Sequence, residues 1–357
     1  SSITATASSW SSAVRPEPAA PVTSDGPLAW DSAARRSRSS EADLGRAVSI
    51  VPGGVTTRLG YAAVAASSSG LEGPSGSDVW LESCRRAAQG LRDVLREHPT
   101  SAQRVIETGT VGEGGDRTLV IDRLAEDQVF GELERLHDLG ERFTVISEER
   151  GRVDFGSDQR FVVVDPLDGS LNAKRGLRQH ALSIAVADGP TMADVVLGYV
   201  LDLGSGDEWH AIRGQGAFLG GEPVRPQPER TLPDGRFELV AMESTDPRHL
   251  VVRAETLQRL TNRVRAFGVM AVTLCQVAET RVDAAFSWAG VRAVDVAAAQ
   301  LIVRESGGFV EFVGCPEGPL GAPLDLEPHH PIVAARSEAA IERLRDLPVP
   351  RVEGARR

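Results

Sequence analysis

The sequence predicts a layered α/β protein, in which segments with a helical period alternate with short strands. Apolar residues recur at the spacing of an amphipathic helix over residues 78–95. Residues 143–146 and 161–164 are short β-rich runs, and two carboxylates closely follow each of them. Because sites collect at strand ends in α/β proteins, we expect the functional residues at the ends of these two runs.

The other elements follow from the same alternation of periods. Gly307 and Gly308 mark the end of a helix, and Pro348 follows the last one. Further helices are predicted at 124–139, 254–262, 269–277, 295–306 and 338–347. Further strands are predicted at 181–187, 195–201, 208–212, 283–287, 309–313 and 331–335, with a turn at 213–218 leading into another.

We expect four parts along the chain. Residues 1–75 are rich in Ser, Ala, Gly and Pro without a sustained period, so we expect a disordered N-terminal extension. Residues 76–225 form an N-terminal α+β half that carries the metal-site loop. Residues 226–349 form a C-terminal α/β half that completes the site, and residues 350–357 form a flexible tail.

Composition and charge narrow the class of protein. A chain of 357 residues with 41% hydrophobic content can bury a sizeable core. The formal charge of −11 argues against nucleic acid as a partner, although divalent cations can bridge carboxylates to an anionic substrate. The three cysteines show no Cys-x-x-Cys spacing, and no apolar stretch is long enough for a membrane span. We therefore expect a cytoplasmic protein with no membrane partner.

The segment Asp-Pro-Leu-Asp-Gly-Ser at residues 165–170 carries the clearest chemical signal. Asp165 and Asp168 follow a buried strand in a tight loop, and an all-oxygen ligand set selects a hard cation such as Mg²⁺. The backbone N–H groups of Gly169 and Ser170 are placed to face a phosphate if a helix starts there. A plain β-turn built from Asp-Pro and Asp-Gly explains the segment equally well.

Spacing removes two other interpretations. Haloacid dehalogenase phosphatases place their second aspartate two residues after the first, whereas Asp165 and Asp168 are three apart. A calcium loop of the EF-hand type starting at Asp165 would place Leu167 and Gly169 at ligand positions 3 and 5. Neither class fits.

Five motifs, in the same order, resemble the inositol monophosphatase superfamily. Residues 165–172 resemble its first signature, and residues 294–308 its second, Trp-Asp-x-Ala-Ala followed by Glu-Ala-Gly-Gly. Ser-Glu-Glu at 147–149 resembles Gly-Glu-Glu, residues 116–122 resemble Asp-x-x-Thr-x-x-Asp with the Thr displaced, and residues 213–218 match a family hairpin. The resemblance runs from about residue 78 to the C-terminus.

This resemblance implies an alternating α/β/α/β/α layered sandwich and a Mg²⁺-dependent phosphomonoesterase. Carried over by position, Glu148, Asp165 and the Leu167 carbonyl would hold one ion, and Asp165, Asp168 and Asp295 a second. Two or three ions per site are expected. From the residues alone, Asp295 can also be read as a helix N-cap.

The resemblance also implies hydrolysis of inositol monophosphate or a related sugar phosphate by metal-activated water, with inhibition by Li⁺. Ser170, in the place of the family's Thr, and Asp122 would orient or deprotonate the water, with Glu148 as a further catalytic residue. A homodimer is expected.

The substrate-selecting positions depart from the inositol-selective members. Gly268 is followed by Val-Met rather than Thr-Ala, and the acidic residue expected near Trp288 is absent. Arg292 is closer to archaeal-type enzymes that also use fructose 1,6-bisphosphate, although an exposed loop arginine is the alternative. Lys174 is the only lysine and either contacts substrate or lies on the surface. The predicted substrate-binding residues are Gly169, Ser170, Gly268, Arg292 and Lys174.

Two alternative functions stay open at this stage. One is a fructose-1,6-bisphosphatase or a dual-specificity enzyme. The other is a non-catalytic regulatory protein that binds sugar phosphate on the same fold, against which the complete carboxylate set argues.

Overall fold

The structure, a computed structural model, describes residues 74–99, 107–113, 117–244 and 246–347. The predicted N-terminal extension, apart from residues 74 and 75, lies outside the described residues, as do the predicted tail at 350–357 and Asp116. None of the helices within the described ranges is long and apolar enough to cross a membrane.

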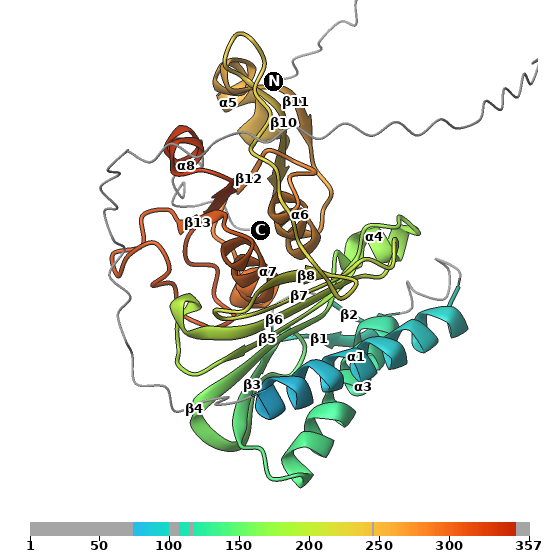
Figure 1. The fold of residues 1–357 in the computed structure, drawn as a ribbon. Helices are drawn as coiled ribbons and strands as arrows, with labels where there is room; N and C mark the ends of the chain where they lie inside the picture. The colour runs from blue at the N-terminus through green and yellow to red at the C-terminus, as the bar shows by residue number, and fades with distance from the viewer. Residues whose placement is uncertain (1–73, 100–106, 114–116, 245, 348–357) are drawn as a thin grey trace, which may run out of the picture. The chain divides into compact units, whose positions relative to one another are not determined.

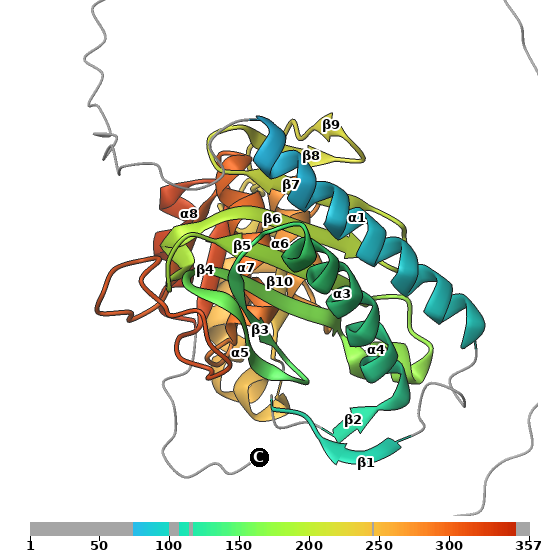
Figure 2. The ribbon, with the colours of Figure 1, turned by 90° about the horizontal axis from the view of Figure 1, so that it is seen from below.

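Two helices form the first layer. α1 (Pro74–Glu97) and α3 (Val120–Asp138) lie side by side over one face of a seven-stranded sheet (Figures 1 and 2). Trp80 and Leu91 of α1 and Leu133 of α3 are buried against that sheet, as their helical spacing predicts. α3 begins at Val120 rather than at residue 124, so its first turn contains Asp122.

The seven-stranded sheet is the second layer. Each strand from β4 onward pairs antiparallel with the next, while β3 pairs with both parts of the long strand β4. The first part of β4, for which no strand was predicted, forms a hairpin with β3 and has alternating burial. In sheet order the strands are β3 (Phe143–Ser147), β4 (Gly151–Asp168), β5 (Ala181–Ala187), β6 (Val195–Asp202), β7 (Glu208–Ile212), β8 (Gly216–Leu219) and β9 (Glu222–Pro223).

A smaller sheet forms the fourth layer. Its strands β11, β10 and β12 are parallel, and β14 and β13 continue the sheet antiparallel. Two of its strands, β10 and β11, were not predicted. In sheet order the strands are β11 (Thr261–Arg265), β10 (Phe237–Glu243), β12 (Ala284–Ser287), β14 (Ile332–Ala335) and β13 (Phe309–Phe312).

Helices form the third layer, between the two sheets, and the fifth layer, on the outer face of the smaller sheet. α6 (Met270–Ala278) and α7 (Ala293–Glu305) lie between the sheets, and α5 (Pro247–Leu260) and α8 (Glu338–Leu344) cover the far side (Figure 1). The predicted α/β/α/β/α sandwich is therefore confirmed. The short elements outside these layers are the strand pair β1 (Glu107–Val111) and β2 (Arg117–Leu119), α4 (Ser170–Arg175) and the 3₁₀ helix η1 (Met192–Asp194).

The central helix α7 is buried on almost all sides, which explains its run of small and apolar residues. It approaches the first sheet so closely that a Cβ added to Gly198 of β6 would lie 2.4 Å from the carbonyl oxygen of Ala298. Glycine at this position lets the helix pack directly on the sheet. The same packing fixes where the first turn of α7 meets the end of β4.

α5 begins seven residues before the predicted start at 254. The Asp246 side chain accepts a hydrogen bond from the Arg248 N–H at 2.8 Å, and Pro247 is the first helical residue. An Asp N-cap followed by Pro is a strong helix start, which the sequence prediction overlooked.

Candidate active site

Three carboxylates converge where the two halves of the fold meet. Asp165 and Asp168 end β4, and Asp295 lies in the first turn of α7. One oxygen from each of the three side chains lies within 4.8 Å of the others. Asp165 is 1% exposed and Asp168 8% exposed, so two of the three charges are buried.

A β-bulge brings the two β4 aspartates together. Asp165 pairs with Ser183 of β5 and Asp168 pairs with Ala181, so β4 contains one more residue than its partner over this interval. Residues three apart on a regular strand point to opposite faces, and the extra residue returns both side chains to one face. The segment is therefore a bulged strand end rather than a free turn.

Backbone N–H groups hold these side chains in place. The Leu167 N–H donates to Asp165 Oδ1 at 2.9 Å, and the Ala271 N–H at the start of α6 donates to Asp168 Oδ2 at 2.7 Å. Gly169 follows with φ of 83°, and a Cβ there would lie 2.9 Å from the Gln179 carbonyl oxygen. Glycine is needed at this position for both conformation and space.

Arg292 bridges the remaining carboxylates. Its Nη1 donates to Glu148 Oε1 at 2.7 Å and its Nη2 to Asp295 Oδ1 at 2.9 Å. Asp295 was expected as a possible N-cap, but α7 begins at Ala293, so Asp295 is the third helical residue. Its Oδ2 accepts from the Arg292 backbone N–H at 3.3 Å and so still satisfies a free donor at the helix start.

Burial and mutual repulsion make ionisation costly here. Burial is the main cause that raises the pKa of Asp165 and Asp168 well above the usual range, and the neighbouring carboxylates add to it. Burial also raises the pKa of Glu148, against the opposing effect of Arg292. For Arg292, burial lowers the pKa, but Asp295 and Glu148 outweigh it and the net shift is upward. The site favours the presence of positive charge.

These residues fit a hard divalent cation. The candidate ligand atoms of Asp165, Asp168 and Asp295 are carboxylate oxygens, which Mg²⁺ prefers, and they lie close to one another. The Arg292 guanidinium already binds two of these carboxylates as a stand-in cation. The guanidinium contacts Glu148 and Asp295 but is the one cation described beside four carboxylates, so the described cluster has room for further positive charge.

A cleft of about 310 Å³ opens beside these carboxylates. Gly268 and Arg292, both predicted to bind substrate, lie on its wall. The lining residues are Asp168, Glu243, Ser244, Gly268, Val269, Met270, Gly290, Val291, Arg292 and Asp295.

Glu243 was missed by the sequence analysis. It is buried at the end of β10, and its carboxylate accepts from the backbone N–H groups of Phe267 and Gly268 and from Thr273 Oγ1. It therefore fixes the cleft wall around Gly268. Its signal was present, because it follows an apolar run just as Asp165 does.

The other predicted residues lie on neighbouring elements. Asp122 is buried in the first turn of α3, and the half-buried Ser170 begins α4. Lys174 lies in the last turn of α4. None of these three lines the cleft.

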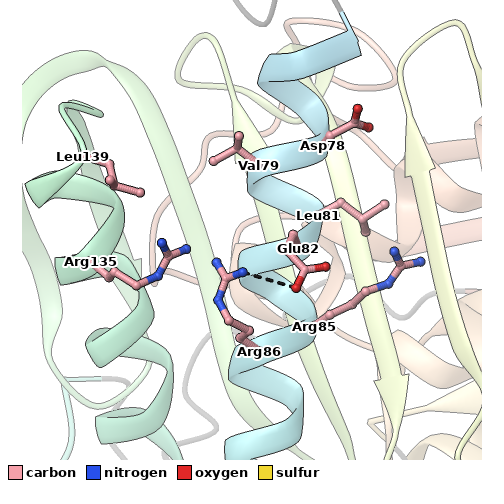
Figure 3. A pocket seen from close by; sticks show the side chains of 8 residues that line it. All are labelled: Asp78, Val79, Leu81, Glu82, Arg85, Arg86, Arg135 and Leu139. Carbon is pink, nitrogen blue, oxygen red and sulfur yellow. Dashed lines mark hydrogen bonds and ion pairs between the residues drawn. The ribbon is translucent and has the colours of Figure 1, made fainter.

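A second, larger cleft of about 520 Å³ lies between α1 and α3 on the outside of the fold (Figure 3). We call it the outer cleft, and its arginines already have carboxylate partners. Arg85 binds Glu208 at 2.9 Å, and Arg86 and Arg135 share Glu132 at 2.8 and 2.9 Å. Its lining residues are Asp78, Val79, Leu81, Glu82, Arg85, Arg86, Arg135 and Leu139.

Known proteins resemble this chain in sequence. The sequence model of the inositol monophosphatase family matches residues 78–348. A protein of Methanothermobacter thermautotrophicus named fructose-1,6-bisphosphatase/inositol-1-monophosphatase is 36% identical over 212 residues, which cover 56% of this chain and 72% of that protein. A Nus factor SuhB of Pasteurella multocida is 30% identical over 210 residues, covering 56% and 73% of the two chains.

Solved structures share the fold. The extragenic suppressor protein suhB of Bartonella henselae matches with a TM-score of 0.62 at 25% identity, over 79% of this chain and all of that chain. The family match, the relatives and the layered fold agree with one another. This chain belongs to the inositol monophosphatase family and is a phosphatase of that family, a hydrolase of phosphoric monoesters.

Proposed function

We propose that this phosphatase depends on Mg²⁺ and hydrolyses inositol monophosphate or a related sugar phosphate. One observation carries the proposal: oxygens of Asp165, Asp168 and Asp295 lie within 4.8 Å of one another, and Asp168 and Asp295 line a cleft of about 310 Å³. That volume lies at the small end of ligand sites and suits a compact phosphate ester.

The chain's own residues have defined tasks in this proposal. Asp165, Asp168 and Asp295, with Glu148 and the Leu167 carbonyl, would hold two or three Mg²⁺ ions. When bound, Mg²⁺ supplies activation of water and neutralisation of phosphate charge. The bulge and the Leu167 and Ala271 N–H groups keep the aspartates in the geometry that this requires.

Ser170 and Asp122 are proposed to orient the attacking water and accept its proton. The water oxygen forms a bond to phosphorus while the bond from phosphorus to the ester oxygen breaks. The leaving oxygen takes up a proton, so the products are a free alcohol and inorganic phosphate. Gly169, the N-cap residue immediately before α4, lets the chain turn at this point.

Fructose 1,6-bisphosphate is the second candidate substrate. Arg292 lines the cleft and would meet a second anionic group, and the 36% identical relative is named for both activities. The case for substrate binding by Lys174 is weaker, since Lys174 does not line the cleft. Inhibition by Li⁺ and a homodimeric state belong to the same proposal.

The test is phosphate release by the full chain from inositol 1-phosphate, fructose 1,6-bisphosphate, histidinol phosphate and adenosine bisphosphates. Release that needs Mg²⁺ and stops in excess chelator is the expected result. Undiminished release in chelator would refute the metal mechanism. Binding of sugar phosphate in Mg²⁺ without turnover of any ester would favour a non-catalytic regulatory protein instead.

A further inference from the structure

We propose that Arg292 competes with the divalent cation for Glu148 and Asp295 and thereby weakens metal binding. The inference rests on the proposed function, because the competing ion is the Mg²⁺ expected at the acidic site. It assigns to Arg292 a role separate from contact with substrate. The role is that of a positioning residue which acts through the two carboxylates.

The contacts of Arg292 use the oxygens that a cation would need. Nη2 donates to Asp295 Oδ1 at 2.9 Å and Nε to Asp295 Oδ2 at 3.2 Å, so both oxygens of Asp295 are engaged. Nη1 donates to Glu148 Oε1 at 2.7 Å. Such charged, two-pronged contacts are among the stronger hydrogen bonds in proteins.

The position of Arg292 makes these contacts hard to avoid. Its side chain is 16% exposed, and it precedes Asp295 by three residues at the start of α7. Glu148 follows β3 of the seven-stranded sheet and contacts Arg292 from there. The guanidinium therefore joins the two halves of the acidic site.

Asp165 and Asp168 do not need Arg292 to hold their positions. They are fixed by the β4 bulge and by the Leu167 and Ala271 N–H groups. Removal of the guanidinium would leave these two ligands in place and free Glu148 Oε1 and Asp295 Oδ1, while Asp295 Oδ2 would keep only the Arg292 backbone N–H. It would also remove a positive charge beside the site, so a divalent cation should bind more tightly.

The cleft offers the guanidinium somewhere to go. Arg292 already lines the cleft, so its side chain can turn toward that space without crossing the core. A cation that binds the carboxylates would repel the guanidinium in that direction. Metal binding and the position of Arg292 are then coupled.

The experiment is a calorimetric titration of Mn²⁺, and separately Mg²⁺, into chelator-treated full-length protein. Arg292→Gln should bind the ion on the order of tenfold more tightly than the wild type, within the usual range of coupling between interacting sites. Its melting temperature should also rise more on addition of the ion. Circular dichroism in chelator checks that the variant is folded.

Arg160→Gln is the matched control. Arg160 is 20% exposed and also bridges two carboxylates, Asp188 at 3.1 Å and Glu141 at 3.2 Å, but none of its partners is in the acidic site. Its affinity for the ion should equal that of the wild type. Arg292→Lys keeps the charge but loses the two-pronged contact, so its affinity should fall between those of the wild type and Arg292→Gln.

The outcomes separate this inference from the proposed function. If the wild type binds the ion and both Arg292 variants bind it equally or more weakly, the competition is refuted while the metal site stands. If the wild type binds neither Mn²⁺ nor Mg²⁺, both proposals fail. If Arg292→Gln is unfolded in chelator, tighter binding by Arg292→Lys supports the competition and unchanged or weaker binding overturns it.

Discussion

The acidic site and the outer cleft are both lined by charged side chains, but they differ in charge balance. In the described acidic site one guanidinium, that of Arg292, lies beside four carboxylates and pairs with Glu148 and Asp295. In the outer cleft each of the three arginines has a carboxylate partner, of which Figure 3 draws the contact between Arg86 and Glu82. The outer cleft is the larger of the two. Unbalanced buried charge, rather than volume, therefore distinguishes the site at which we propose the reaction.

The energetic consequences differ in the same way. The outer ion pairs are partly exposed and screened by water, so each contributes little to folding. The acidic site instead buries two aspartates beside other carboxylates, which costs folding free energy unless positive charge compensates it. A protein keeps such an arrangement where a reaction needs it.

The largest effect is expected for Asp168→Asn. The substitution keeps an oxygen that can accept from the Ala271 N–H but removes a charge from the metal-binding set. We expect turnover to fall on the order of a thousandfold or more, with an unchanged melting temperature within a few degrees. Steady-state phosphate release and thermal unfolding measure the two quantities.

Arg135→Gln in the outer cleft is the matched substitution on the other side of the comparison. Its partners Glu132 and Ser83 retain Arg86, so stability should fall by about 1 kcal/mol or less. Turnover should be unchanged. A loss of turnover here as large as in Asp168→Asn would show that charge balance does not mark the site.

The stability of the protein should depend on pH through the carboxylates of the acidic site. The pKa values of Asp165, Asp168 and Glu148 are raised in the folded protein, mainly by burial. At a pH above the pKa values of these groups in the unfolded chain, which are about 4, the folded state therefore holds more protons than the unfolded chain. In chelator, the free energy of unfolding should fall as pH rises from there through the folded pKa values.

Saturating Mg²⁺ should remove this fall, because the cation binds the ionised carboxylates. Urea unfolding at a series of pH values, with chelator or with Mg²⁺, measures the difference. Asp168→Asn removes one titrating group and should show a shallower fall in chelator. Equal slopes with and without Mg²⁺ would argue against a cation at these residues.

For Gly169→Ala we expect a smaller effect on turnover than for Asp168→Asn, together with a loss of stability. The residue has φ of 83°, and a Cβ would lie 2.9 Å from the Gln179 carbonyl oxygen, so we expect a loss of about 1–3 kcal/mol in stability. Gly176→Ala is the control, since Gly176 has φ of 73° with no atom within 4 Å of the added Cβ. It should cost less and leave turnover intact, whereas Gly169→Ala should lower both. Denaturant unfolding measures the stability of both variants, and phosphate release measures their turnover.

Local patterns predicted most of the layers and part of the site. The strand-end aspartates Asp165 and Asp168 were recognisable because short-range spacing and glycine chemistry define them. The strand at Phe237–Glu243 was missed, since neighbouring strands rather than a clear alternation stabilise it. The bulge in β4 was also invisible, because it depends on the register with β5.

Long-range contacts set the remaining features of the site. Nothing in the local sequence pairs Arg292 with Glu148, which is 144 residues away. The start of α7 at Ala293, which places Asp295 in the first helical turn, is likewise decided by packing of α7 between the sheets. The sequence thus offered Arg292 as a substrate-binding residue, but not its pairing with Glu148 and Asp295.

The central claim is that the unbalanced carboxylates bind divalent cations. Anomalous diffraction from crystals of the full chain soaked in Mn²⁺ tests it most directly. We expect a manganese peak in contact with Asp165, Asp168 and Asp295 and none in the outer cleft. Full soaking without a peak at these three residues, or with the only peak in the outer cleft, would contradict it.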